Sequence, residues 1–337
     1  MSKKIRIAVN GPGRIGRSII RAIYEEKMSD DFEIVAINGS APIETIKHLL
    51  KYDSVHGRFN HEVEIRDHNL FVDNKKIILT AERDPRKLNW KEHNIDVVFE
   101  CTGAFTKYDD AYQHINAGAK KVIISAPAKE DSVKTIVYGV NHNNLNKDDH
   151  VISIGSCTTN CLAPIVKILN DTIGIEKGFM TTIHAYTNDQ NIVDNTHKDL
   201  RRARACAMSM IPTSTGAAKA IGLVLPELNG KLDGVAIRVP TPNVSMVDLN
   251  FIAKNNTSIA EVNSLIKNAL NGEMKRVLSY IEEPLVSIDF NHNNISSNFD
   301  ATQTKVIGGN LVKVCSWYDN EWAFSVRMLD VAKLMIK

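Results

Sequence analysis

The fold of this 337-residue chain is decided by the stretch Ile5-Arg6-Ile7-Ala8-Val9-Asn10-Gly11-Pro12-Gly13-Arg14-Ile15-Gly16-Arg17. Residues 5–9 predict a buried strand, and the apolar spacing of Ile19, Ile20 and Ile23 predicts a helix after the turn. The glycines form a G-x-G-x-x-G pattern, which permits a tight turn and lets a pyrophosphate approach the helix N-terminus. A glycine-rich turn without a ligand is the alternative. Because the pattern lies between a strand and a helix, we expect a dinucleotide-binding site here.

The end of the next predicted strand bears on which dinucleotide is bound. Residues 34–38 form an apolar run, and Gly39 and Ser40 follow it. NAD sites usually carry an acidic residue at this position, where it binds the adenosine ribose 2′-hydroxyl. Without that negative charge, the site is open to the 2′-phosphate of NADP. No arginine stands beside Gly39 in the sequence, so a simple loss of selectivity is the alternative.

The stretch from Ile152 to Pro164 supplies a candidate nucleophile. It has the pattern of a short strand, a turn at Gly155 and a helix, so Cys157 is expected at a helix N-terminus. Backbone N–H groups and the helix dipole stabilise a thiolate there, and they could hold the oxyanion of a tetrahedral adduct. The alternative is a small buried cysteine, which is the commoner fate of a single Cys.

The other strands fall into two patterns. Further strand-like runs in the first part of the chain, separated by helical segments, predict a parallel, doubly wound sheet. Later runs have fewer helices between them and predict a largely antiparallel sheet. The runs lie at residues 70–72, 77–79, 97–101 and 121–125, and then at 179–186, 235–239, 245–251 and 311–317.

We therefore expect two domains. Residues 1–155 form a dinucleotide-binding α/β domain of Rossmann type, and residues 156–320 form a catalytic α+β domain. A C-terminal helix over residues 321–337 is expected to pack back on the first domain. Residues 187–209 form a long, polar and basic connection, and such loops are usually functional or interfacial.

Composition excludes several classes of protein. The chain is 43% hydrophobic and 24% charged with a formal net charge of +2, and it lacks the blocks of like charge typical of polyanion binders. No apolar run has the length of a bilayer span, and no secretory signal is recognisable, so we expect a cytoplasmic protein. Its five cysteines form no CxxC pair, which argues against a disulfide framework and a metal site.

Taken together, these features resemble the phosphorylating glyceraldehyde-3-phosphate dehydrogenases. The resemblance covers essentially the whole chain, and the motif around Cys157 is highly specific. The matching motifs are Asn10–Arg17, His48–Gly57, Ser156–Pro164, His184–Thr187, His197–Arg204, Pro212–Lys219, Arg238–Pro242 and Trp317–Trp322.

The resemblance implies a reaction at Cys157. The thiolate would attack the aldehyde to give a thiohemiacetal, with His184 as the activating base. A single strand histidine is more often structural, and only the family motif reverses that expectation. Hydride transfer to NAD would leave a thioester, which inorganic phosphate converts to an acyl phosphate. This is the step shared by glycolysis and gluconeogenesis.

The resemblance also implies two anion sites and a set of coenzyme contacts. Thr187 and Arg238 would bind the substrate phosphate, because hydroxyl and guanidinium groups form strong hydrogen bonds to phosphate. The attacking phosphate would be bound by Ser156, Thr158, Arg202, Thr215 and Gly216. The coenzyme would contact Gly11, Gly13, Arg14, Ile15, Gly16, Gly39, Arg83, Ser125 and Asn320.

The chain also departs from the family pattern. Pro12 replaces the usual Phe, and Ile154-Gly155 replaces the usual Asn-Ala. Asn195-Thr196 stands where NAD-specific members tend to carry Leu-Pro, which together with Gly39 predicts dual use of the coenzymes or a preference for NADP.

Two other functions compete with this interpretation. The first is oxidation of erythrose 4-phosphate, which ends in hydrolysis, and the second is a non-catalytic role in binding nucleotides or nucleic acid. The charge balance favours neither nucleic acid nor membrane as the main partner. The family is tetrameric, so we expect a homotetramer.

Overall fold

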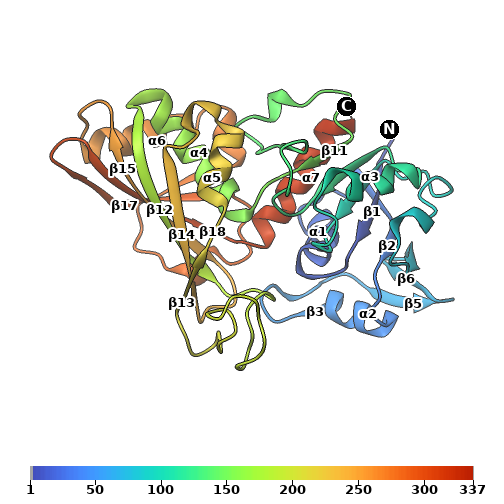
Figure 1. The fold of residues 1–337 in the computed structure, drawn as a ribbon. Coiled ribbons are helices and arrows are strands. Elements are labelled where there is room, and N and C mark those ends of the chain that lie inside the picture. Colours follow the sequence, from blue (N-terminus) through green and yellow to red (C-terminus); the bar gives the residue numbers. More distant parts are fainter. Residues whose placement is uncertain (1–2, 337) are drawn as a thin grey trace. The chain divides into compact units, whose positions relative to one another are not determined.

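The computed structural model describes residues 3–336, and the chain divides into two compact units. Unit 1 consists of the residues up to Ile136, residues His142–Gly155 and the residues from Ser325 onward. Unit 2 consists of Val137–Asn141 and Ser156–Phe324. Figure 1 labels the elements along the chain.

Unit 1 is built on a nine-stranded sheet with the order β10-β11-β9-β8-β1-β2-β7-β6-β5. From β10 to β7 the neighbouring strands are parallel, whereas β7, β6 and β5 form an antiparallel edge. β8 and β9 are buried along their whole length, as expected for a sheet covered on both faces. The predicted doubly wound sheet is therefore confirmed.

The elements of unit 1 have the following bounds. Its sheet strands are β1 (Ile5–Asn10), β2 (Phe32–Asn38), β5 (Val63–Arg66), β6 (Asn69–Val72), β7 (Lys75–Thr80), β8 (Val97–Glu100), β9 (Lys121–Ile124), β10 (Lys134–Thr135) and β11 (Val151–Ser153). A separate pair consists of β3 (Tyr52–Asp53) and β4 (Gly57–Arg58). Its helices are α1 (Arg14–Glu25), α2 (Ile43–Lys51), α3 (Tyr108–Asn116) and the 3-10 turns at Pro85–Lys87 and His142–Asn144.

Unit 2 is built on a seven-stranded sheet with the order β13-β14-β12-β15-β18-β17-β16. The pairs β12–β14 and β16–β17 are parallel, and the other four are antiparallel. Its strands are β12 (Ile175–Ala185), β13 (Ile211–Ser214), β14 (Leu232–Val239), β15 (Ser245–Ala253), β16 (Leu278–Ile281), β17 (Ser297–Ile307) and β18 (Leu311–Tyr318). The mixed, mainly antiparallel sheet confirms the second part of the predicted fold class.

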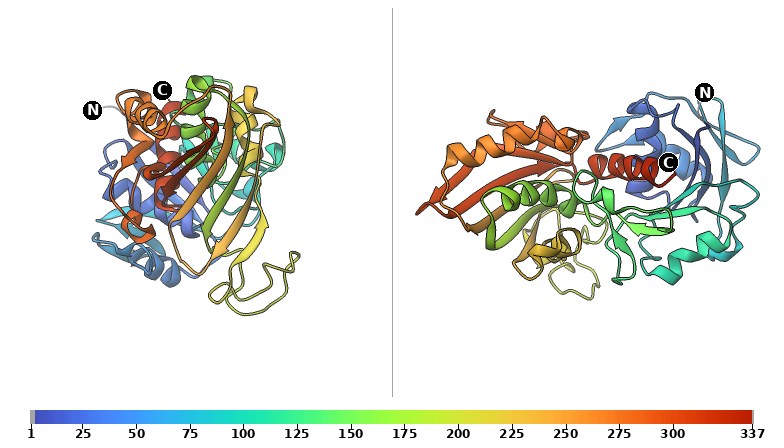
Figure 2. Two further views of the ribbon diagram at one scale, coloured as in Figure 1. Left: turned by 90° about the vertical axis from the view of Figure 1, so that its left-hand side faces the viewer. Right: turned by 90° about the horizontal axis from the view of Figure 1, so that it is seen from above.

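Helices cover one face of this second sheet, as both views of Figure 2 show. Apolar residues of α4 (Cys157–Thr172), α5 (Ala217–Val224) and α6 (Ile259–Ala269) form one core with residues of the strands. In β12, Met180 and Thr182 are buried on this face, while Phe179 on the opposite face is half exposed. Further 3-10 turns lie at Pro226–Leu228, Glu273–Arg276 and Ser287–Phe290.

The long strand β17 was not predicted, because its sequence is polar. Ser297, Asn298 and Asp300 are nevertheless buried, and each hydrogen-bonds to a partner inside unit 2. Buried polar side chains of this kind are tolerated when they are satisfied.

The last helix, α7 (Trp322–Ile336), begins in unit 2 and belongs to unit 1 from Ser325 onward. Within unit 1, Lys333 pairs with Asp31 at 2.5 Å. None of the helices between residues 3 and 336 combines the length and the apolar character of a bilayer-spanning segment.

Candidate active site

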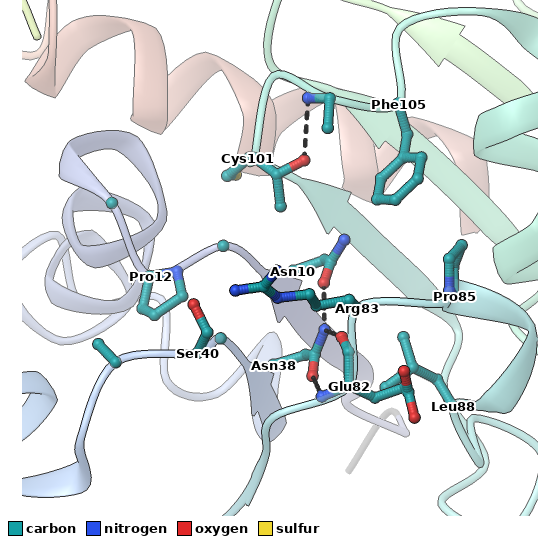
Figure 3. A pocket seen from close by; sticks show the side chains of 16 residues that line it. Asn10, Pro12, Asn38, Ser40, Glu82, Arg83, Pro85, Leu88, Cys101 and Phe105 are labelled. Atoms are coloured by element: carbon teal, nitrogen blue, oxygen red, sulfur yellow. Dashed lines mark hydrogen bonds between the residues drawn. The ribbon is translucent and has the colours of Figure 1, made fainter.

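A cleft of about 520 Å³ lies in unit 1 where β1, β2, β7 and β8 end. Its walls are the loops that follow these four parallel strands (Figure 3). From β1 the chain continues through α1 to β2 on one side, and from β8 it continues through α3 to β9 on the other side. Open α/β sheets bind their ligands in the crevice where the strand order reverses in this way. The cleft therefore has the position expected of a dinucleotide site.

The glycines after β1 shape one wall of this cleft. Gly11 has φ +99°, and a Cβ atom built on it would lie 2.8 Å from the backbone nitrogen of Thr102. A Cβ on Gly16 would lie 2.2 Å from the carbonyl oxygen of Gly11, whereas one on Gly13 would meet nothing within 4 Å. The first and third glycines thus permit close packing, and the second leaves open space for a ligand.

A hydrogen-bonded network of buried side chains lies beneath this wall. The Asn10 amide donates to Glu100 Oε2 at 2.5 Å, and the Asn38 amide donates to Asn10 Oδ1 at 2.7 Å. The Trp90 indole N–H donates to His114 Nδ1 at 3.0 Å, so the imidazole proton sits on Nε2, 3.2 Å from Glu100 Oε2. Each of these side chains has its partner inside unit 1.

Three arginines predicted or placed near the cleft differ in what they contact. Arg14 forms a bidentate pair with Asp53 at 2.5 and 3.1 Å. Burial raises the pKa of Asp53, but Arg14 and the backbone N–H groups of Val55 and His56 together lower it to about 2. Arg17 donates to the carbonyl of Pro12 at 2.8 Å. Arg83 lines the cleft together with Gly39 and Ser40. Figure 3 shows its side chain running across the cleft toward Pro12 and Ser40.

In unit 2, Cys157 and His184 lie together. Ser156 caps α4 by accepting a hydrogen bond from the Thr159 N–H at 3.0 Å, so Cys157 is the first residue of the helix. Its Sγ lies 3.5 Å from His184 Nε2. His184 is on β12, and its Nδ1 lies 2.7 Å from the carbonyl oxygen of Ala185. A proton on Nδ1 would leave the lone pair of Nε2 facing the thiol.

The electrostatics of this pair are governed by burial. Burial raises the pKa of the Cys157 thiol, while Arg238 and hydrogen bonds from Thr158 act in the opposite direction. Burial and Arg238 lower the pKa of His184 to about 3, so its imidazole is neutral at pH 7. Burial thus outweighs the helix terminus, and deprotonation of the thiol needs a nearby acceptor such as Nε2.

Arg238 adjoins this pair through strand register. Arg238 on β14 is the parallel partner of His184 on β12, and its Nη1 lies 3.0 Å from the Ala185 oxygen and 2.8 Å from His184 Nδ1. Because a guanidinium can only donate, Nη1 donates to the Ala185 oxygen when Nδ1 carries the imidazole proton, whereas donation to Nδ1 would place that proton on Nε2. Its Nε atom is buried without a hydrogen-bond partner among the described residues. A buried donor without a partner calls for a ligand, and a guanidinium prefers an anion.

Arg202 is held differently. It contacts Asp189, its Nε donates to Thr213 Oγ1 at 2.7 Å, and its Nη2 donates to the Ser214 carbonyl at 3.2 Å. A second carboxylate is close, because Asp199 Oδ2 lies 3.5 Å from Arg202 Nε. The two carboxylates therefore offset its charge, and its contact with Ser214 brings it to the segment that holds Thr215.

Comparison with known proteins identifies the family. The family described as "Glyceraldehyde 3-phosphate dehydrogenase, NAD binding domain" matches residues 5–108, and its "C-terminal domain" matches residues 156–320. The glyceraldehyde-3-phosphate dehydrogenase of Xanthobacter flavus is 57% identical over 333 residues, which is 99% of each chain. Those of Cupriavidus necator (plasmid) and Geobacillus stearothermophilus are 57% and 56% identical over 97% of each chain. The chain belongs to the glyceraldehyde-3-phosphate dehydrogenase family.

The remaining residues predicted to bind phosphate in this member of the family make hydrogen bonds within unit 2. Thr158 Oγ1 is 2.8 Å from the Tyr318 hydroxyl, and Thr187 Oγ1 is 3.2 Å from Gln190 Oε1. Thr215 accepts from the Ala217 N–H at 3.2 Å, beside Gly216, which caps α5. These side chains and Ser156 thus have partners within unit 2.

Four residues that were predicted to contact the coenzyme or to set its selectivity hydrogen-bond to other residues of their own unit. Asn320 is buried and accepts from Ser245 at 2.8 Å. Ser125 follows β9, with its N–H donating to the Glu100 carbonyl at 3.0 Å. Asn195 and Thr196 are exposed and hydrogen-bond within their own loop.

Sequence reasoning missed several residues of this family member's candidate site. The sequence did not predict that Asp189 and Asp199 pair with Arg202, because no local pattern distinguishes an isolated acidic residue in a loop. Tyr318 was noted only as part of a motif, yet its buried hydroxyl joins Thr158 to Thr182 at 2.8 Å each. No arginine is next to Gly39 in the sequence, but the structure brings the predicted coenzyme residue Arg83 to it. β2 and β7 pair so that Asn38 lies opposite Thr80, which brings Arg83 to the same cleft.

Proposed function

We propose that this chain oxidises glyceraldehyde 3-phosphate to 1,3-bisphosphoglycerate, using a nicotinamide dinucleotide and inorganic phosphate. The observation that supports this most is the contact of the Cys157 thiol with His184 at the N-terminus of α4, next to the unpaired Nε of Arg238. The relatives named glyceraldehyde-3-phosphate dehydrogenase match over almost their whole length.

The proposed chemistry uses Cys157 and His184 in turn. His184 Nε2 accepts the thiol proton as Sγ attacks the aldehyde carbon, and returns it to the alkoxide to give a thiohemiacetal. The N–H groups at the start of α4 stabilise that alkoxide. His184 then accepts the hydroxyl proton as the carbon is oxidised to a thioester. When bound, the coenzyme supplies the hydride acceptor. Attack by phosphate releases Cys157 as the leaving group.

The two anions are proposed to bind at different arginines. Arg238 and Thr187 bind the substrate phosphate, because Arg238 has a buried donor without a partner beside the reacting pair. Ser156, Thr158, Arg202, Thr215 and Gly216 bind the attacking phosphate. Arg202 reaches the 213–216 segment, although Asp189 and Asp199 compete for its charge.

The coenzyme is proposed to bind in the cleft of unit 1. The open space above Gly13 and the close packing at Gly11 and Gly16 fit a pyrophosphate at the start of α1. Arg14, Ile15, Gly39, Arg83, Ser125 and Asn320 are the further proposed contacts. We also propose that NADP is accepted. Arg83 forms no ion pair within residues 3–336 and lines the cleft beside Gly39 and Ser40, so it is available to a 2′-phosphate.

One set of rate measurements tests the reaction. Reduction of each coenzyme is followed with glyceraldehyde 3-phosphate or erythrose 4-phosphate, with and without inorganic phosphate. We expect phosphate-dependent turnover with the triose substrate. Faster, phosphate-independent oxidation of erythrose 4-phosphate would favour the competing activity, and the absence of any reduction would favour a binding role. A preference for NAD of several hundredfold in kcat/KM would reject the use of NADP.

We further propose a cytoplasmic homotetramer. All five cysteines are free thiols, which is typical of a reducing compartment. The connection between β12 and β13 exposes large apolar side chains, among them Leu200 at 83% and Met208 at 86%, and Phe179 is exposed on the uncovered face of the unit 2 sheet. Such apolar surface is typical of subunit interfaces. Light scattering that gives a monomer would contradict the tetramer.

A further inference from the structure

Any side chain at position 39, where this chain has Gly39, would clash with the ring of Pro12. A Cβ atom built on Gly39 would lie 2.3 Å from Cδ and 2.6 Å from Cγ of the Pro12 ring. Real Cβ atoms do not come this close to another heavy atom. The ring is closed onto its own backbone, so it cannot swing aside as the end of a long side chain would.

The backbone at Gly39 does not itself require glycine. Its φ lies outside the left-handed region, in contrast to Gly11 with φ +99° in the same cleft. The three atoms nearest to the built Cβ all belong to Pro12, and the third of them, its nitrogen, is already 3.8 Å away. The restriction to glycine at position 39 therefore comes from the residue at position 12.

Neither segment can easily move away from the other. The Gly11 N–H donates to the Asn38 carbonyl at 2.8 Å, and the Gly39 N–H donates to the Thr80 carbonyl at 2.9 Å. Arg17 holds the Pro12 carbonyl at 2.8 Å. The backbone of Thr102 blocks retreat on the far side of Gly11. A side chain at position 39 would have to break one of these contacts or distort the cleft.

We propose that Pro12 is a specificity-determining residue of the dinucleotide cleft: its ring excludes every side chain, and hence every carboxylate, from the end of β2. An acid at that position would bind a ribose 2′-hydroxyl and repel a 2′-phosphate. Pro12 thus keeps position 39, next to Ser40 and Arg83, free of a carboxylate, and Glu82 is the acidic residue in the lining of the cleft. The inference rests on the proposed use of NADP, and it predicts that a side chain is accepted at position 39 only where Pro12 has also been replaced.

A double-mutant cycle in the full-length protein tests the steric part. Gly39→Ala is made alone and with Pro12→Ala, which removes the two clashing ring atoms. Tm and the Kd values for NAD and NADP are measured without aldehyde. Gly39→Ala alone should lower Tm and weaken both dinucleotides by at least about fivefold, as overpacking does, and Pro12→Ala should rescue both properties. Equal effects of Gly39→Ala in the two backgrounds would overturn the proposal. Gly13→Ala, with free space around its Cβ, is the control for Tm.

A second cycle with Gly39→Asp tests the selectivity part. Alone, this variant should bind both coenzymes poorly or fail to fold. Combined with Pro12→Ala, it should bind NAD at least about tenfold more tightly than NADP, because the carboxylate can then occupy the strand end. A single Gly39→Asp variant that folds normally and prefers NAD as strongly as the double variant would contradict the role of Pro12. Both cycles measure binding and unfolding only, so a failure of the proposed oxidation reaction would be seen separately in the turnover assay.

Discussion

Two clusters of buried polar groups, one in each unit, are satisfied in different ways. Beneath the cleft of unit 1, Glu100, His114 and Trp90 hydrogen-bond to one another and leave no group waiting for a ligand. In unit 2, the thiol of Cys157 is 3.5 Å from His184, and Arg238 keeps a buried Nε without a partner. The first arrangement builds a rigid platform, whereas the second holds back interactions that a substrate can complete. Substitutions in the first cluster should therefore cost stability, and substitutions in the second should cost catalysis.

The largest effect is expected at Cys157. Cys157→Ala removes the proposed nucleophile, so kcat/KM should fall by at least about 10³-fold. The Kd for NAD should change little, because the dinucleotide cleft lies within unit 1. Cys161→Ala is the matched control, since this buried thiol lies on the same helix and should leave turnover measurable. Unchanged coenzyme reduction by Cys157→Ala would refute the catalytic account of unit 2.

Arg238→Gln should have the next largest effect. Loss of the charge should lower kcat/KM for the phosphorylated aldehyde by about 100-fold, mainly through binding of the substrate phosphate. Because Arg238 lowers the pKa of the Cys157 thiol, alkylation of that thiol by iodoacetamide should shift to higher pH in the variant. If the pH dependence of Cys157 alkylation were the same in the variant and the wild type, Arg238 would not act on the thiol.

His114→Phe tests the platform in unit 1. The indole N–H of Trp90 loses its acceptor and Glu100 loses a donor, which should cost about 1–3 kcal/mol of stability. The alkylation rate of Cys157 should remain that of the wild type. Thermal unfolding measures the first effect, with His48→Phe at an exposed site as control. A normal Tm for His114→Phe would break the contrast between the units.

The smallest effect is expected at Asp189. Asp189→Asn removes one carboxylate from Arg202, so the KM for inorganic phosphate should fall roughly two- to fivefold, as expected for a partly exposed ion pair. The KM for the aldehyde should change less, because the charge of Asp189 acts on Arg238 through space and no ion pair joins the two among the described residues. An increase in the KM for phosphate would mean that Asp189 positions Arg202 rather than competing for it.

Local patterns in the sequence predicted much of the fold. The strand–glycine–helix at β1 and α1, and the thiol at the start of α4, depend on neighbours in the chain and lie where expected. β17 could not be predicted, because its polar residues are buried by partners from distant strands. Helical or strand periodicity carries no information about such partners.

The candidate site was predictable only where a motif marked it. Arg238 meets His184 through the register of two strands that are 54 residues apart, and no local pattern encodes that register. The same holds for Arg83 beside Gly39, and for Pro12 against Gly39. Each pair becomes visible only when the ends of neighbouring parallel strands, and the loops that follow them, are brought together.

The most direct test of the central claim is to identify the acylated residue. The protein is mixed with glyceraldehyde 3-phosphate and coenzyme in the absence of inorganic phosphate, quenched in acid and digested, and the peptides are analysed by mass spectrometry. The account predicts a phosphoglyceroyl thioester on Cys157, none on Cys161, and its disappearance when phosphate is added before the quench. An adduct on another residue, or coenzyme reduction with no adduct at Cys157, would contradict it.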